Sequence, residues 1–384
     1  MEKIFYEDTH ILRFEATVIE CILVDGLFHI VLDRTAFFPE EGGQLADTGT
    51  LNDLPVRDVS IDKDIIYHHM DKPFEIGTTV AGCVDWERRF DFMQQHSGEH
   101  IISGLLHKHY GFHNVGFHLG LTEVTLDFDG SIGMEALRDI EAEANQIVFS
   151  NRPIHCFFPD RDELKTMEYR SKIEIEGAVR IVEIPGVDVC ACCAPHVRST
   201  AEIGIIKITG VQSHRGGVRI NILCGERALK DYTTKQESVN TLSALLSAKP
   251  ELVVDAVKKL QEDGLKQKDT INHLANQLLQ LQIASLPTPV ACSNPILFVE
   301  LSNPIAIRNT VNELTSEYSG YCGIFNGNEQ NGYTFIIGSS TLDCRTLATT
   351  LREKFGAKGG GTAPMIQGNV KASKEDLITL FQNI

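Results

Sequence analysis

The chain has 384 residues, of which 42% are hydrophobic and 23% charged, and its formal net charge is −17 at neutral pH. This length allows two or three domains with cores of their own, and no apolar run approaches the roughly 20 residues of a membrane span. Residues 1–225 hold 36 acidic and 20 basic side chains, which argues against broad nonspecific binding to nucleic acid but allows a local basic patch.

The N-terminal region, residues 1–85, is predicted to be a β-rich, β-barrel-like module. Its first residues lack the apolar stretch of a secretion signal, so we expect a cytoplasmic protein without a membrane partner. The segment ATVIECILVDGLFHIVLDRT (16–35) predicts two strands joined at Asp25-Gly26, which is a strong hairpin signal. Short strands and Gly, Pro and Asp turns continue to about Cys83.

Residues 86–225 are predicted to form an α/β domain. DWERRFDFMQQHSGEHIISGLLHKHYGF has apolar residues at helical spacing, and Gly111 is a suitable stop. A second helical pattern, EALRDIEAEANQIVFS, is followed by short strands that end with GVRINILCG at residues 217–225. Taken with the flanking regions, this alternation predicts an α+β protein.

The C-terminal part divides into a helical segment, residues 226–285, and an α/β domain, residues 293–384. Apolar side chains in the segment recur at alternating spacings of three and four residues up to Leu281, with a break at Pro250. Either a dimer-forming coiled coil or a helical hairpin packed on its own domain fits this pattern. The linker SLPTPVACSNP, which contains Cys292, separates the segment from the last domain.

Two separated motifs predict a metal site. In HSGEH, His96 and His100 are four residues apart and therefore project from the same face of a helix. In CCAPH, Cys192 and His196 lie in a loop, and either Cys190 or Cys193 can replace Cys192 as the ligand. Mixed imidazole and thiolate ligands suit Zn²⁺.

The first motif also fits the H-x-x-E-H pattern of a zinc protease, with Glu99 as general base. A Cys/His pair is the wrong companion for that arrangement. Glu99 also lies about 100° around the helix from His100. We therefore expect Glu99 to point away from the metal.

The motifs HSGEH and CCAPH, with RTAFFPEEGGQLADTG at residues 34–49, resemble the editing domain of alanyl-tRNA synthetases and the freestanding AlaX proteins. KGGGTAPMIQG, residues 358–368, resembles part of the C-terminal domain that follows the coiled coil in the synthetase. The resemblance covers nearly the whole chain and corresponds to the long form of AlaX.

This resemblance implies a zinc-dependent deacylase that hydrolyses mischarged Ser-tRNA(Ala) and, in some members, Gly-tRNA(Ala). It implies that His96, His100, Cys192 and His196 are the zinc ligands. Thr35 matches a threonine associated with recognition of the serine hydroxyl, and Gln44 matches a glutamine that lines the editing pocket.

The role of zinc, the class of activity and the contacts with tRNA each have alternatives. Four protein ligands fill a tetrahedral shell, the arrangement usual for structural zinc. Either a ligand yields or the coordination expands so that zinc can activate water, or zinc only shapes the pocket and positions the substrate. A noncatalytic tRNA- or synthetase-binding module and a metalloprotease are the alternatives, and a homodimer through the helical and C-terminal regions is a further expectation. The side chains we expect to contact tRNA are Arg88, Arg89, Arg215, Arg219 and Lys358.

Overall fold

The computed structural model describes residues 1–171, 177–289, 293–301 and 304–384, so Cys292 lies outside the described residues. The chain divides into two compact units, residues 1–238 and 239–384. This division is coarser than the four regions expected from the sequence, whose boundaries stay predictions. Among the described helices, none combines the length and apolar character needed to cross a membrane.

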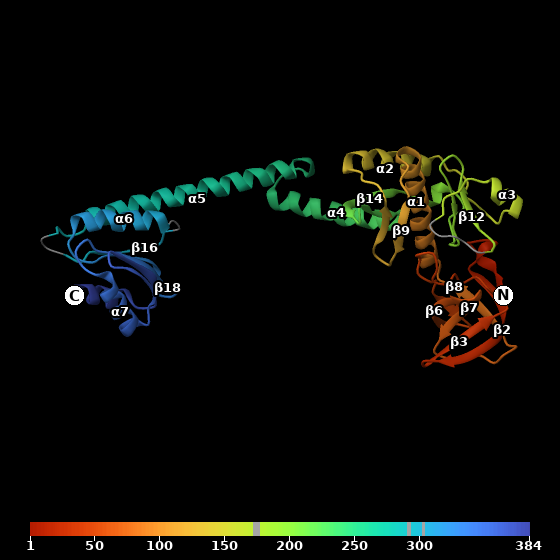
Figure 1. Ribbon diagram of the computed structural model, residues 1–384, viewed down its shortest axis with the longest axis horizontal. Coiled ribbons are helices and arrows are strands. Elements are labelled where there is room, and N and C mark those ends of the chain that lie inside the picture. The colour runs from red at the N-terminus through yellow and green to blue at the C-terminus, as the bar shows by residue number, and fades with distance from the viewer. Residues whose placement is uncertain (172–176, 290–292, 302–303) are drawn as a thin grey trace. The chain divides into compact units, whose positions relative to one another are not determined.

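The first unit begins with a closed barrel of six strands, drawn in red and orange in Figure 1. In barrel order the strands are β2 (Arg13–Val24), β3 (Leu27–Leu32), β7 (Ile65–Met70), β6 (Leu54–Asp62), β5 (Gly49–Leu51) and β8 (Thr79–Val84). The hairpin predicted at Asp25-Gly26 is confirmed, because both residues have positive φ and Val24 pairs with Leu27. Two short strands, β1 (Glu2–Lys3) and β4 (Arg34–Thr35), pair beside the barrel.

The helix α1 (Trp86–Tyr110) follows the barrel directly. It begins at Asp85, whose side chain accepts a hydrogen bond from the Arg88 backbone N–H, and it ends at Gly111 in the left-handed conformation. Its middle turns are buried on almost every side, because α1 lies against α2 (Met134–Phe149), a four-stranded sheet and a three-stranded sheet. The helix and its stop were both predicted.

Two antiparallel sheets complete the first unit. The four-stranded sheet consists of β14 (Ile206–His214), β15 (Gly217–Cys224), β10 (Val124–Phe128) and β9 (Asn114–Leu119). The smaller sheet consists of β11 (His155–Phe157), β12 (Ile181–Ile184) and β13 (Asp188–Ala191), and the short helix α3 (Arg161–Thr166) follows β11. One apolar core joins α1 and α2 to both sheets.

The second unit has a five-stranded sheet with helices on both faces. The strands in order are β16 (Ile296–Val299), β17 (Cys322–Asn328), β18 (Gly332–Gly338), β20 (Met365–Val370) and β19 (Lys358–Thr362). The helices α5 (Val253–Ala284) and α6 (Pro304–Glu317) pack on one face, and α7 (Cys344–Phe355) and α8 (Lys374–Gln382) pack on the other. The mixed α/β character expected of the chain is therefore present in both units.

The predicted helical segment forms two helices separated at Pro250. The helix α4 (Gly225–Leu246) ends four residues before this proline, and a 3₁₀ turn, Pro250–Leu252, leads into α5. Leu279 of α5 packs into the C-terminal core, whereas Leu274, Leu278 and other members of the apolar series are exposed. The coiled coil and the dimer stay predictions.

Candidate metal centre

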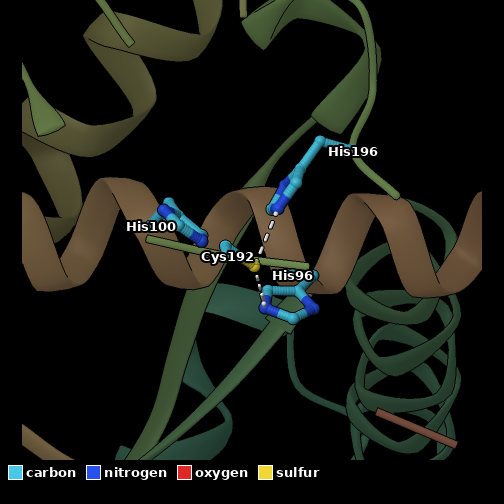
Figure 2. A group of neighbouring side chains, drawn as sticks. All are labelled: His96, His100, Cys192 and His196. Atoms are coloured by element: carbon cyan, nitrogen blue, oxygen red, sulfur yellow. Dashed lines mark hydrogen bonds between the residues drawn. The ribbon is translucent and has the colours of Figure 1, made fainter. Parts of the chain in front are cut away.

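Four side chains from a helix and a distant loop converge inside the first unit. His96 and His100 lie on α1, and Cys192 and His196 lie in the loop after β13. Their ligand atoms all lie within 4.8 Å of one another. Figure 2 shows the four side chains gathered around Cys192. All three histidines are buried. The structure thus brings together the residues that the two spacings predicted.

The two nitrogens of His96 and of His196 face different partners. Each Nε2 points to Cys192 Sγ, at 3.5 Å from His96 and 3.4 Å from His196. The Nδ1 of His96 is 2.9 Å from Gln44 Oε1, and the Nδ1 of His196 is 2.9 Å from Ser97 Oγ. An amide oxygen only accepts hydrogen bonds, so His96 Nδ1 carries a proton and donates it to Gln44.

His100 is held by a buried carboxylate. Its Nδ1 donates to Asp188 Oδ2 at 2.9 Å, and Asp188 also forms a two-pronged ion pair with Arg170 at 2.7 and 2.8 Å. Burial lowers the pKa of His100, but hydrogen bonds to Asp188 and Cys192 outweigh it and raise the pKa to about 10. A metal ion would therefore compete with a proton for this imidazole.

The electrostatics distinguish Cys192 from its neighbours. Burial raises the pKa of the Cys192 thiol, but the charges and hydrogen bonds of His96, His100 and His196 lower it well below its ordinary value. Burial raises the pKa of Cys190, which keeps that thiol protonated. The thiolate is the metal-binding form, so Cys192 is the best ligand in the cluster.

Neither Cys190 nor Cys193 replaces Cys192 in the group of four. Burial also raises the pKa of Cys193. Cys190 joins His100 and Asp188 in a second group of possible ligands. Asp188, however, already pairs with a guanidinium, and this cation disfavours a metal ion at the same carboxylate.

Gln44 is positioned by a tight turn against β9. Gly43 has φ +82°, and a Cβ at this position would lie 2.7 Å from Phe117 O, so only glycine fits. Leu119 N–H donates to Gly43 O at 2.9 Å, and the Phe117 ring packs on the His96 imidazole. The backbone at Gly43 therefore packs closely against β9 and fixes the start of the Gln44 side chain.

Gln44 is fully buried, and one of its polar atoms has no hydrogen-bond partner among the described residues. Gln44 Oε1 contacts His96, but its Nε2 makes no hydrogen bond within the described part of the chain. Buried donors are nearly always satisfied, and leaving one unpaired costs about 1–3 kcal/mol. The amide NH₂ beside the metal centre is therefore suited to a ligand that brings an acceptor oxygen.

Glu99 is absent from the group of possible metal ligands. Its Oε1 accepts hydrogen bonds from Ser103 Oγ at 2.7 Å and from Asn114 Nδ2 at 2.5 Å. Its Oε2 lies 3.8 Å from His100 Nε2. The carboxylate is thus committed to a buried polar cluster on one side of α1, and this commitment disfavours a role as a free general base.

Thr35 lies on β4 and is fully buried. Its Oγ1 is 2.8 Å from His68 Nε2 and accepts a hydrogen bond from Phe37 N–H at 3.1 Å. Sequence reasoning missed His68. The available signal was a histidine between Ile66 and Met70, at the inward-facing positions of an alternating strand.

The structure corrects the expected tRNA contact by Arg89. This side chain is fully buried, and its guanidinium pairs with the equally buried Asp47. It also donates to Thr9 O at 3.0 Å and to Ala36 O at 2.6 Å. Its charge therefore joins α1 to the barrel instead of facing a nucleic acid.

The other predicted cationic side chains are distributed over several elements. Arg215, in the turn between β14 and β15, and Lys358, on β19, are exposed. Arg219 forms a two-pronged pair with Asp127 at 2.6 and 2.7 Å, and Arg88 donates to Ala46 O and lies over the ring of Phe92. Of these four side chains, Arg215 and Lys358 are therefore the most accessible to a nucleic acid.

Comparisons with known proteins agree with the motifs. Residues 179–221 match the family described as threonyl and alanyl tRNA synthetase second additional domain, and residues 7–88 match tRNA synthetases class II (A). The mouse "Alanyl-tRNA editing protein Aarsd1" is 31% identical over 90% of this chain and 85% of its own length. The rat protein of the same name is 30% identical over 96% of this chain and 93% of its own length. The "Alanine--tRNA ligase" of Ignicoccus hospitalis is 29% identical over the whole chain, which spans 42% of that ligase.

Proposed function

The chain belongs to the family of the alanyl-tRNA editing proteins, and from this premise we propose that it hydrolyses the ester bond of tRNA(Ala) mischarged with serine or glycine. The observation that carries the proposal is the buried group of three imidazoles and one thiolate beside Gln44, whose Nε2 has no hydrogen-bond partner in the described part of the chain. Buried polar groups of this kind are expensive unless a ligand satisfies them.

Zinc is the metal that we propose for the four ligands. In a tetrahedral zinc site, Zn–S of about 2.3 Å and Zn–N of about 2.05 Å separate sulfur and nitrogen by about 3.6 Å. The separations of Cys192 Sγ from His96 Nε2 and His196 Nε2 are 3.5 and 3.4 Å, which supports the fit. The Nδ1 partners Gln44, Asp188 and Ser97 would hold the rings in place, as outer partners do in zinc sites. Bound zinc would supply positive charge and Lewis acidity beside the ester.

Gln44 and Thr35 have separate roles in this proposal. The Gln44 Nε2 donates to the ester carbonyl oxygen, whose negative charge grows as water attacks the carbonyl carbon. The Thr35 hydroxyl contacts the serine side chain. Alanine has no hydroxyl for that contact and forgoes its hydrogen bond, so correctly charged Ala-tRNA(Ala) is spared.

We also propose that tRNA(Ala) contacts exposed cations and that the protein acts in the cytoplasm as a homodimer. The exposure of Arg215 and Lys358 supports such a contact. Arg88 and Arg219 already form hydrogen bonds within the protein, to Ala46 O and Asp127. The exposed apolar series of α5 supports dimer formation through the helical region.

The test compares metal content and deacylation in matched cysteine variants. We expect about one zinc per chain, rapid hydrolysis of Ser-tRNA(Ala), slower hydrolysis of Gly-tRNA(Ala) and little of Ala-tRNA(Ala). Cys192→Ala should lose both zinc and hydrolysis, whereas Cys193→Ala, in the neighbouring residue outside the group of four, should keep zinc.

Other outcomes identify the competing functions. Binding of tRNA without hydrolysis of any aminoacyl ester by the wild-type protein would support a noncatalytic module and overturn the proposal. Peptide cleavage that survives Cys192→Ala would support a protease instead, because that reaction has no need of the cysteine ligand.

A further inference from the structure

The other contacts of Thr35 and His68 determine which of the two donates the hydrogen bond between them. Both side chains are 0% exposed, and their polar atoms are 2.8 Å apart. The ring of Phe37 packs edge-on against the His68 imidazole and helps to close the site from water. In such surroundings each donor and acceptor must be accounted for.

The hydrogen bonds of His68 determine which nitrogen carries its proton. His68 Nδ1 is 3.0 Å from the backbone oxygen of Ile30, and a carbonyl oxygen only accepts. The proton therefore lies on Nδ1. Burial lowers the pKa of His68 to about 4, so the ring is neutral near neutral pH and Nε2 is an acceptor.

The Thr35 hydroxyl must then donate its only hydrogen to His68 Nε2. One lone pair of Thr35 Oγ1 accepts from the Phe37 backbone N–H at 3.1 Å. One acceptor position is left on the oxygen and no donor. The hydroxyl can therefore form a further hydrogen bond only with a group that donates.

We propose that His68 is a positioning residue that fixes the hydrogen-bond polarity of Thr35, so that Thr35 accepts from the substrate side chain and never donates to it. The inference rests on the proposed editing function and deepens it. The group that Thr35 recognises is then a hydrogen-bond donor, such as the side-chain hydroxyl of a seryl ester. Thr35 should not bind substrate side chains that can only accept a hydrogen bond.

The position of Thr35 relative to the metal centre supports this role. Ala36 and Phe37, which follow it, belong to the barrel core that includes Ala194 from the metal-bearing loop, and Cys192 packs against the same core. The segment that follows Thr35 and the metal-bearing loop thus contribute to one apolar core.

The experiment measures kcat/KM for Ser-tRNA(Ala) and Ala-tRNA(Ala), which differ by a single hydroxyl in the amino acid. We compare the wild-type protein with His68→Phe, which keeps a ring but has no acceptor, and with Thr35→Val, which keeps the shape without the hydroxyl. Each substitution should reduce the ratio of seryl to alanyl hydrolysis about tenfold, the effect of one neutral hydrogen bond.

The double variant gives the decisive comparison. If His68 acts through Thr35, adding His68→Phe to Thr35→Val should not lower the ratio further. His68→Gln, whose amide has both a donor and an acceptor, should restore part of the lost selectivity. Zinc content and melting temperature are measured for every variant.

Two results would overturn the inference. One is a wild-type ratio in His68→Phe protein that is folded and retains zinc, because the polarity of Thr35 would then not depend on His68. The other is multiplicative loss in the double variant. Failure of the wild-type protein to hydrolyse any aminoacyl-tRNA is a different result, since it overturns the editing function itself.

Discussion

The buried ion pair of Arg89 and Asp47 gives a stability prediction that is independent of the activity. Asp47→Asn keeps the size of the side chain but removes its charge, and it leaves the Arg89 guanidinium uncompensated in the core. Both residues are 0% exposed, and Arg89 Nε lies 3.0 and 3.1 Å from the two carboxylate oxygens. Removing one partner of such a pair costs about 3–5 kcal/mol.

An exposed pair on the same barrel provides the matched control. Arg57 and Asp71 approach to 2.6 Å, but their side chains are 58% and 52% exposed. Water screens this pair, so Asp71→Asn should cost less than about 1 kcal/mol. The difference between the two Asp→Asn variants therefore isolates the effect of burial.

Urea unfolding followed by tryptophan fluorescence measures both variants. The chain has a single tryptophan, Trp86, in the first turn of α1, and its ring stacks on Phe90. We expect Asp47→Asn to lower the free energy of unfolding by about 3–5 kcal/mol. In a thermal scan of a unit of about this size, the same loss corresponds to a fall in melting temperature of roughly 6–20 °C. Equal losses in the Asp47→Asn and Asp71→Asn variants would refute the assignment of Arg89 to the core and reopen its role at the surface.

Three other predictions test separate features. Asp188→Asn should weaken zinc binding about 10–100-fold in a chelator competition, because His100 loses its carboxylate partner; unchanged affinity would contradict the outer-partner role. Lowering the pH from 6.5 toward 4 should destabilise the wild-type protein by up to about 3 kcal/mol through His68, since its pKa falls from 6.5 in the unfolded chain to about 4 in the folded one. Above pH 6.5 His68 is neutral in both states, so its protonation costs no stability there. In urea titrations the free energy of unfolding of His68→Phe should therefore fall less steeply with acid than that of the wild-type protein. An identical pH dependence of the two proteins would argue against a buried neutral ring. Ile271→Lys, in the exposed series of α5, should shift the protein from dimer to monomer in sedimentation experiments, whereas a wild-type protein that is already monomeric would refute the coiled-coil dimer.

The sequence by itself determined the features that depend on neighbouring residues. The turn at Asp25-Gly26 follows from backbone preferences, and the helix that ends at Gly111 follows from apolar spacing and a left-handed stop. The common direction of His96 and His100 follows from helix geometry. The resemblance of short motifs then linked these local features to Cys192 and His196, nearly a hundred residues away.

Only the tertiary structure decided which polar groups meet across the core. It showed that Arg89 is an internal cation, that Cys192 is the cysteine beside three imidazoles, and that His68 from another strand contacts Thr35. Periodicity indicates whether a side chain faces inward, but not which distant side chain it will meet there. That choice depends on how the barrel, α1 and the loop after β13 pack together, and this packing sets the burial, the pKa values and the direction of each hydrogen bond.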